Sequence, residues 1–234
     1  MTETRPSGTD KSRQEARYDV AIVGGGLVGA SLACALTPLG LRVALVEAVA
    51  FKAASQPSYD DRTLALSDSS CRILQGLGIW SGLEYTTPIR EIQVRELDRP
   101  GRVVMNPREM GLDCFGHVVE ARSFGAAVTR RIGTLEGLDF ICPASVTAVQ
   151  TGKDAVRVEY QGEDGPACLD AELLVGADGA QSFIRESLGI ECERHDYGQT
   201  ALICNITPEE DHRGRAFETF TPTGPFAVMP HVNG

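Results

Sequence analysis

A glycine-rich turn between an apolar strand and an apolar helix constrains the fold of this chain more than any other feature. Residues 18–36 read YDVAIVGGGLVGASLACAL, with glycines in the G-x-G-x-x-G spacing. Residues 18–23 are predicted to form a buried strand, because continuous aliphatic residues suit a parallel sheet covered on both faces. Residues 27–36 are rich in Ala and Leu and predict a helix, and residues 42–47 predict a second strand. Together these segments predict a βαβ unit.

The spacing of the glycines is typical of a dinucleotide site. Gly24 allows the tight turn, Gly26 leaves room for a pyrophosphate beside the backbone, and Gly29 lets helix and strand pack closely. The helix N-terminus then presents free N–H groups and a positive dipole end to the anion. Glu47 ends the second strand, where its carboxylate can accept hydrogen bonds from ribose hydroxyls and would repel a 2′-phosphate. These residues predict a dinucleotide other than NADP and leave FAD and NAD open.

Two further stretches bear on the choice of cofactor. Arg62 follows a polar loop and could fold over a pyrophosphate, although a surface ion pair with Asp60 or Asp61 is the simpler interpretation from these residues alone. Asp178 and Gly179 follow an apolar strand, at the sheet edge where α/β proteins bind ligands. The Asp178 carboxylate could accept from a ribityl or ribose hydroxyl, while a plain strand-to-helix turn is the alternative.

The rest of the chain alternates between sequence patterns typical of parallel βαβ units and patterns typical of antiparallel sheets. Polar–apolar alternation at 89–97 and 102–105 predicts antiparallel strands. The remaining predicted elements are a helix near 68–75, a strand and helix across 117–132 with Arg122 opening the helix, a hairpin across 145–162, a strand, turn and helix across 171–190, and strands at 199–206, 215–220 and 225–230. The predicted class is α/β: a Rossmann-like domain with a parallel sheet, plus part of an antiparallel-sheet domain.

Composition excludes several classes of function. The net charge of −10, without a basic patch, argues against nucleic acid as a partner. The seven cysteines are scattered, odd in number and never spaced C-x-x-C, so we expect buried free thiols. The four histidines lack metal-ligand spacing, so no metal site is predicted.

No window is apolar enough to span a membrane, and the triple glycine argues against reading the first apolar run as a signal peptide. Residues 1–17 are therefore expected to form a disordered tail, and the protein is expected to be cytoplasmic.

Four motifs, in order, give the chain a family resemblance. GGGLVGASLACAL, DDRTLALS, VVEARSFG and GADGAQSFIRESLG together resemble the single-component FAD-dependent aromatic hydroxylases, whose fold is that of p-hydroxybenzoate hydroxylase. DDRTLALSDSS, GHVVEAR and GRAFETFTPTGPFAVMP look most like the ubiquinone-biosynthesis branch, which includes 2-octaprenyl-6-methoxyphenol hydroxylase. The resemblance runs from residue 18 to residue 234.

The resemblance implies a cofactor and a set of residues that bind it. It implies FAD, with NAD(P)H as co-substrate and O₂ as the oxygen source, and a phenol as substrate. The implied cofactor-binding residues are Gly24, Gly26, Gly29 and Glu47 for the ADP half, Arg62, Glu120 and Arg122 near the flavin, and Asp178 and Gly179. It also implies a discontinuous FAD-binding domain at 18–85 and 110–190, with a partial substrate domain at 86–109 and 191–234.

The chain departs from the family at one point. The family has a later Gly-Asp motif at the flavin, and this sequence contains no Gly-Asp dipeptide, so we expect an amino-terminal piece with an incomplete flavin site. Three hypotheses stay open: a monooxygenase acting on a polyprenylated phenol at the periphery of the inner membrane, an NAD-dependent dehydrogenase, and a non-catalytic nucleotide-binding subunit of a biosynthetic complex.

No catalytic residue is assigned from the sequence, because the difficult chemistry belongs to the cofactor. His195 and Tyr197 are polar candidates for which a structural role is the simpler interpretation. Four apolar residues could line a pocket for a prenylated ring, although ordinary core packing explains them as well: Phe217, Phe220, Phe226 and Met229.

Overall fold

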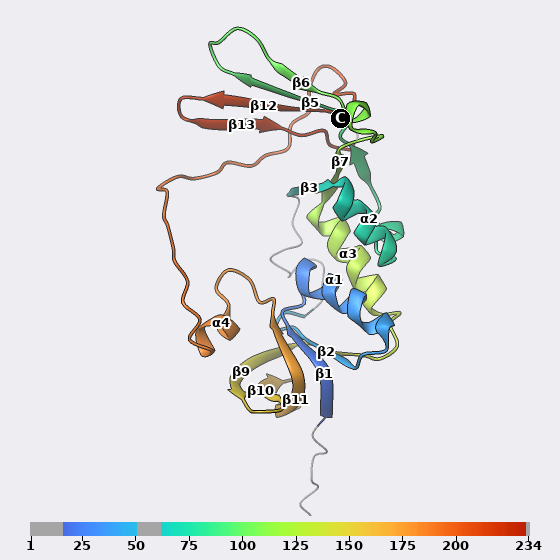
Figure 1. The fold of residues 1–234 in the computed structure, drawn as a ribbon, viewed down its shortest axis with the longest axis vertical. Helices are drawn as coiled ribbons and strands as arrows, with labels where there is room; N and C mark the ends of the chain where they lie inside the picture. Colours follow the sequence, from blue (N-terminus) through green and yellow to red (C-terminus); the bar gives the residue numbers. More distant parts are fainter. Residues whose placement is uncertain (1–15, 51–61, 233–234) are drawn as a thin grey trace, which may run out of the picture.

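The computed structural model describes residues 16–50 and 62–232, which form three β-sheets and the helices packed against them. The molecule is elongated (Figure 1), with a six-stranded sheet at its lower end, helices α1, α2 and α3 in the middle and a four-stranded sheet at its upper end. The predicted combination of parallel and antiparallel sheet is confirmed.

The six-stranded sheet holds the βαβ unit that the glycine spacing predicts. Its strands are β1 (Ala16–Val23), β2 (Val43–Val46), β8 (Leu138–Ile141), β9 (Ala144–Thr151), β10 (Val156–Gly162) and β11 (Gly165–Gly176), in the order β8-β2-β1-β11-β10-β9. Strands β8, β2, β1 and β11 run parallel, and β10 pairs antiparallel with both of its neighbours. Helix α1 (Leu27–Leu36) connects β1 to β2.

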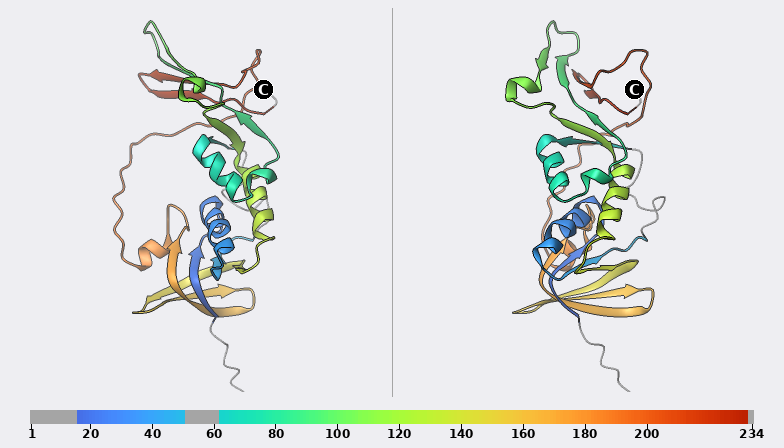
Figure 2. Two further views of the ribbon diagram at one scale, coloured as in Figure 1. Left: turned by 45° about the vertical axis from the view of Figure 1, so that its right-hand side comes forward. Right: turned by 90° about the vertical axis from the view of Figure 1, so that its right-hand side faces the viewer.

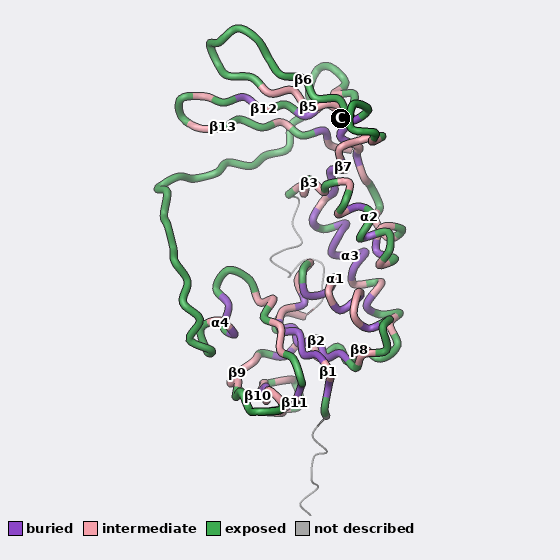
Figure 3. Tube along the Cα trace, viewed as in Figure 1, coloured by how far each residue is buried: buried purple, intermediate pink, exposed green. Residues whose placement is uncertain are grey.

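Both faces of the parallel strands are buried, which explains their continuous aliphatic sequences. Ile22 and Leu45 point into a core shared with α1 and with α3 (Ala121–Ile132). Ala44 and Val46 point into a second core on the opposite face, packed with residues of β10 and β11 such as Val158. Figure 3 shows this burial concentrated in β1, β2 and the helices. Burial on both faces is what fixes β1 and β2 as the centre of the sheet.

Two smaller sheets lie beyond the helices. One consists of β3 (Thr63–Ser67), β7 (Gly116–Glu120) and β4 (Thr86–Pro88), and the other has the order β13 (Gly224–Val228), β12 (Arg215–Thr221), β5 (Glu91–Glu96) and β6 (Val103–Met105). The remaining helical segments are α2 (Asp68–Gly76), α4 (Phe183–Ser187) and the 3₁₀ turns Thr37–Leu39, Trp80–Gly82 and Pro107–Met110. The antiparallel strands expected at 89–97 and 102–105 are confirmed as the pair β5–β6.

The boundaries differ from expectation in a few places. Strand β1 begins at Ala16, two residues inside the segment expected to be a tail, while the rest of that tail lies outside the described residues. Most of the polar loop before Arg62 also lies outside them. Strands β3, β4 and β8 were not expected, since each is five residues or fewer and lacks a clear alternation.

The strand expected at 199–206 is wrong. Within the described chain, residues 190–211 form neither helix nor strand and are exposed throughout, with Leu202 94% exposed. An extended segment becomes a strand only when a neighbour pairs with its backbone, and the segment here runs outside the body from α4 to β12 in Figure 1 and in the left view of Figure 2. This path also places Cys192 and Cys204 on the surface, so the expectation that every cysteine is buried is wrong.

Candidate functional site

Two of the three motif glycines are required by close packing. Gly24 has φ +103°, and a Cβ there would collide with the Ala177 carbonyl and lie 2.8 Å from the Asp178 Cα. A Cβ on Gly29 would collide with the Gly24 carbonyl and lie 3.1 Å from the Ala177 Cβ. The turn between β1 and α1 therefore packs directly against the end of β11, and only glycine fits at both positions.

The third glycine leaves the start of α1 open. Gly26 is the N-cap of α1, with φ −63° and ψ −175°, and no side chain of the described residues caps the helix. The first turn of α1 contains no acidic residue. An uncapped helix start beside a glycine turn can hold a pyrophosphate, because its free N–H groups and the dipole both favour an anion. The residues present therefore fit the diphosphate of a dinucleotide.

Glu47 faces the glycine turn rather than solvent. Its side chain is buried, one oxygen accepts a hydrogen bond from Gly25 N at 2.5 Å, and the other accepts from Val49 N at 2.7 Å. These two bonds hold the carboxylate at the carboxyl end of β2, beside the start of α1. Each oxygen keeps a further lone pair, so a ribose hydroxyl can still bind there; that contact stays a prediction.

Asp178 and Gly179 form the turn between β11 and α4. The Asp178 carboxylate accepts from Ser182 Oγ at 2.5 Å and from Ile184 N at 3.1 Å, and Gly179 has φ +86°. The side chain thus caps α4 while its backbone packs on Gly24. A contact between Asp178 and a ribityl or ribose hydroxyl stays a prediction.

The other predicted residues gather at a second place, where β3 and β7 lie side by side. Thr63 pairs with Glu120, and Ala121 N donates to the Arg62 carbonyl at 2.9 Å, so Arg62, Glu120 and Arg122 are close in space. Both arginine side chains are exposed, with Arg122 in the first turn of α3. The Glu120 carboxylate lies 3.5 Å from His231 Nε2, a contact that the sequence did not reveal because 111 residues separate the two.

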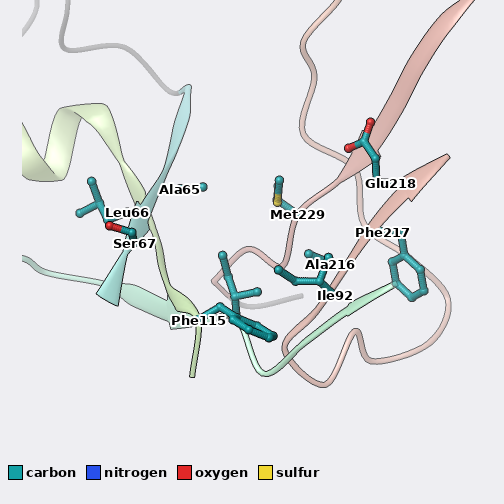
Figure 4. Close-up of a pocket in the computed structure, with 10 residues that line it drawn as sticks. Ala65, Leu66, Ser67, Ile92, Phe115, Ala216, Phe217, Glu218 and Met229 are labelled. Atoms are coloured by element: carbon teal, nitrogen blue, oxygen red, sulfur yellow. The ribbon is translucent and has the colours of Figure 1, made fainter. Parts of the chain in front are cut away.

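An apolar cavity of about 250 Å³ lies between the two small sheets. Its lining comes from β3, β12 and the chain around β5 and β7, and includes Leu66, Ile92, Phe115 and Met229 (Figure 4). Phe217 also lines it, and with Phe226 it lines a second cavity of about 370 Å³ on the four-stranded sheet.

The alternative of ordinary core packing is wrong for the four apolar candidates. The side chains of Phe217, Phe220, Phe226 and Met229 are 36%, 53%, 62% and 42% exposed. Phe217 and Met229 instead line the open cavities described above. The rings of His195 and Tyr197 stack edge to face, 4.7 Å apart, within the exposed connection 190–211.

Comparison with known proteins identifies the family. A family model described as an FAD binding domain matches residues 17–233. Ubiquinone hydroxylase UbiL of Rhodospirillum rubrum is 38% identical over 91% of this chain, and 3-demethoxyubiquinol 3-hydroxylase of Escherichia coli is 31% identical over 91%. The aligned regions make up 49% and 54% of those two proteins, so the chain spans about half the length of these curated relatives.

Solved structures agree on the fold. The crystal structure of p-nitrophenol 4-monooxygenase PnpA from Pseudomonas putida superposes with a TM-score of 0.63 at 22% identity, over 75% of this chain and 44% of that one. The expected fold, shared with p-hydroxybenzoate hydroxylase, is thereby confirmed.

Among the described residues there is no cluster of potential metal ligands and no helix long and apolar enough to cross a membrane. The chain belongs to the FAD-binding-domain family, and the two curated relatives named above are a ubiquinone hydroxylase and a 3-demethoxyubiquinol 3-hydroxylase.

Proposed function

We propose that this chain is the FAD-binding part of a monooxygenase that hydroxylates a polyprenylated phenol in ubiquinone biosynthesis, with NAD(P)H and O₂ as co-substrates. The names of the relatives UbiL and 3-demethoxyubiquinol 3-hydroxylase support the reaction class. The observation that carries the proposal is the glycine turn packed under Asp178, with the Glu47 carboxylate held beside it. In this proposal 18–85 and 110–190 bind FAD, and 86–109 and 191–234 begin the substrate domain.

The chain's own residues would bind and orient the cofactor. Gly26 and the start of α1 would hold the diphosphate, and Glu47 would accept hydrogen bonds from the adenosine ribose. Arg62, Glu120 and Arg122 would lie nearer the flavin, with Asp178 and Gly179 on the opposite side of the turn. Bound FAD would supply the chemistry, since it accepts a hydride from NAD(P)H and activates O₂.

The apolar cavity is the place we propose for the substrate ring. At about 250 Å³ it falls just below the ~300–1,000 Å³ of sites for drug-sized ligands, so it suits one ring with short substituents. A prenyl tail would then extend over neighbouring exposed apolar side chains such as Phe217 and Met229. A substrate of this kind resides in membranes, so we propose peripheral contact with a membrane surface.

An absorbance spectrum combined with an isotope measurement tests this proposal. The purified chain, mixed with FAD and desalted, should retain flavin absorbance, and adding NAD should not displace it. When the longer protein that contains this chain is given NAD(P)H, a prenylated phenol and labelled O₂, the hydroxylated product should carry one labelled oxygen. Retention of NAD without flavin would instead indicate a dehydrogenase. Flavin retention by the chain without labelled product from the longer protein would contradict the monooxygenase proposal and leave a nucleotide-binding subunit.

A further inference from the structure

Two cysteine sulfurs from different parts of the chain lie near the same histidine ring nitrogen. Cys71 Sγ in α2 and Cys114 Sγ, just before β7, each lie 3.8 Å from His117 Nδ1. The two sulfurs can therefore be no farther apart than twice that distance. The flavin site described above uses none of these three side chains.

The backbone holds both cysteines at this place. Ser67 pairs with Gly116, Leu66 pairs with His117, and Asp68 N donates to the Phe115 carbonyl at 3.0 Å. The start of α2 and the approach to β7 are thus joined by backbone hydrogen bonds a few residues from each thiol. Trp80 contacts the His117 ring edge to face, with centroids 5.1 Å apart, and this fixes the orientation of the imidazole.

The two thiols differ in burial, which assigns them different roles. Cys71 is 4% exposed, and burial raises the pKa of its thiol, whereas Cys114 is half-buried and accessible to a small oxidant. Burial lowers the pKa of His117, which favours its neutral form, and Nδ1 lies 3.8 Å from each sulfur, where it can accept from either thiol. The thiolate is the reactive form of cysteine, and a neighbouring imidazole base is a common way to generate it.

We propose that Cys114 and Cys71 form a peroxide-sensitive dithiol, in which Cys114 reacts first, His117 takes its proton and Cys71 completes a disulfide. The Cys114 thiolate attacks hydrogen peroxide, the O–O bond breaks, and the sulfur becomes a sulfenic acid while hydroxide recovers the proton from His117 as water. The Cys71 sulfur then attacks the Cys114 sulfur, an S–S bond replaces the S–O bond, and a second water leaves. Two thiols lose two electrons, and one peroxide becomes two waters.

The bond would change the wall of the apolar cavity. A disulfide needs sulfurs about 2.05 Å apart, so the segment before β7 must move towards α2. Residues 111–114 form neither helix nor strand within the described chain, so Cys114 can shift against Phe115, which backbone hydrogen bonds to Ile89 and Asp68 hold in place. Phe115, Leu66 and Ser67 all line the cavity (Figure 4). Oxidation of the pair would thus alter the proposed substrate site, while the test below needs neither FAD nor substrate.

Peptide mapping after peroxide treatment tests the proposal. The reference is the Cys192→Ser/Cys204→Ser double variant, which removes the two exposed thiols. After limiting hydrogen peroxide and trypsin without reductant, peptides 63–72 and 109–122, which carry one cysteine each, should appear linked. Cys114 should oxidise at least about tenfold faster than half-buried Cys168, and His117→Asn should remove that advantage.

Single substitutions separate the two steps. In Cys71→Ala a sulfenic acid at Cys114 should be trapped by dimedone, and in Cys114→Ala Cys71 should stay reduced. Trp80 is the chain's only tryptophan, so its fluorescence should change on oxidation of the reference chain and stay constant in both single variants. Oxidation of Cys114 without linkage to Cys71, or at the rate of Cys168, would overturn the proposal.

Discussion

At Gly24 and Gly29 one added methyl group decides whether the turn after β1 can pack on the end of β11. Both hypothetical Cβ atoms run into backbone carbonyls, which cannot rotate away as a side chain can. Gly26 differs, because its φ of −63° is open to any residue. The same motif therefore contains two glycines that packing requires and one whose backbone dihedrals do not require glycine.

This difference predicts opposite results for two alanine substitutions. Gly29→Ala should lower the free energy of unfolding by about 1–3 kcal/mol or more, since the new methyl group overpacks the turn. Gly26→Ala should leave the unfolding midpoint nearly unchanged and weaken nucleotide binding, because its methyl group enters the space of the diphosphate. Urea denaturation and FAD titration of the two variants measure both effects. If Gly26→Ala bound FAD as tightly as the parent chain, the diphosphate would lie elsewhere.

Glu47 should matter both to the fold and to the nucleotide. Glu47→Gln replaces a carboxylate that accepts from Gly25 N and Val49 N with an amide that can satisfy only one of them. We expect a loss of about 1.5–3 kcal/mol in nucleotide affinity, as for a charge-assisted hydrogen bond, together with a lower unfolding midpoint. Glu172→Gln, at an exposed ion pair with Arg17, is the matched control and should change neither. Equal affinities for both variants would exclude a ribose contact at Glu47.

The sequence revealed residues that act near their own motif and missed those that meet across the fold. Gly24, Gly29 and Glu47 could be placed because strand, turn and helix periodicity fixes their positions. The meeting of Glu120 with His231, or of Cys71 and Cys114 at His117, depends on which strands become neighbours. No local pattern encodes that pairing, so these contacts needed the structure.

At the scale of elements, long periodic segments were predicted well and short or unpaired ones were not. Helix α1 has the predicted bounds, and β9 and β10 form the predicted hairpin. Strand β3 was missed because five residues show little alternation, and it exists by pairing with β7. The apolar residues within 199–206 suggested a strand, yet no described strand pairs with it. Sequence pattern indicates that a segment suits a strand, while pairing decides whether it becomes one.

The exposed connection 190–211 should be the first described segment that a protease cuts. Arg194 lies in this connection, whereas Lys153 lies in the tight turn between β9 and β10, which a Gly152 N to Ala155 O hydrogen bond of 2.8 Å closes. A protease needs several residues of unpaired backbone, so trypsin should cleave after Arg194 well before Lys153. Timed digestion with mass spectrometry gives the order. Earlier cleavage after Lys153 would show that 190–211 pairs with something in solution.

In the molecule as a whole, the candidate nucleotide site and the candidate substrate cavity lie in different regions. The glycine turn belongs to the six-stranded sheet, and the apolar cavity lies between the two smaller sheets, on the other side of α1, α2 and α3 (Figure 1). Exposed apolar residues such as Phe226 and Val103 lie on the outer strands β13 and β6, which have one free edge each among the described strands. Such edges favour pairing with further β-structure. The region that we propose binds the nucleotide is thus the more completely buried of the two.

We propose that the turn after β1 and the Glu47 carboxylate hold the ADP half of FAD. Calorimetric titration of the purified chain with FAD, ADP and FMN tests it most directly, because FMN carries the flavin without the adenosine diphosphate. We expect FAD to bind, ADP to compete with it for the same site, and FMN to bind at least about tenfold more weakly. FMN binding as tightly as FAD, or FAD binding that ADP does not displace, would contradict it.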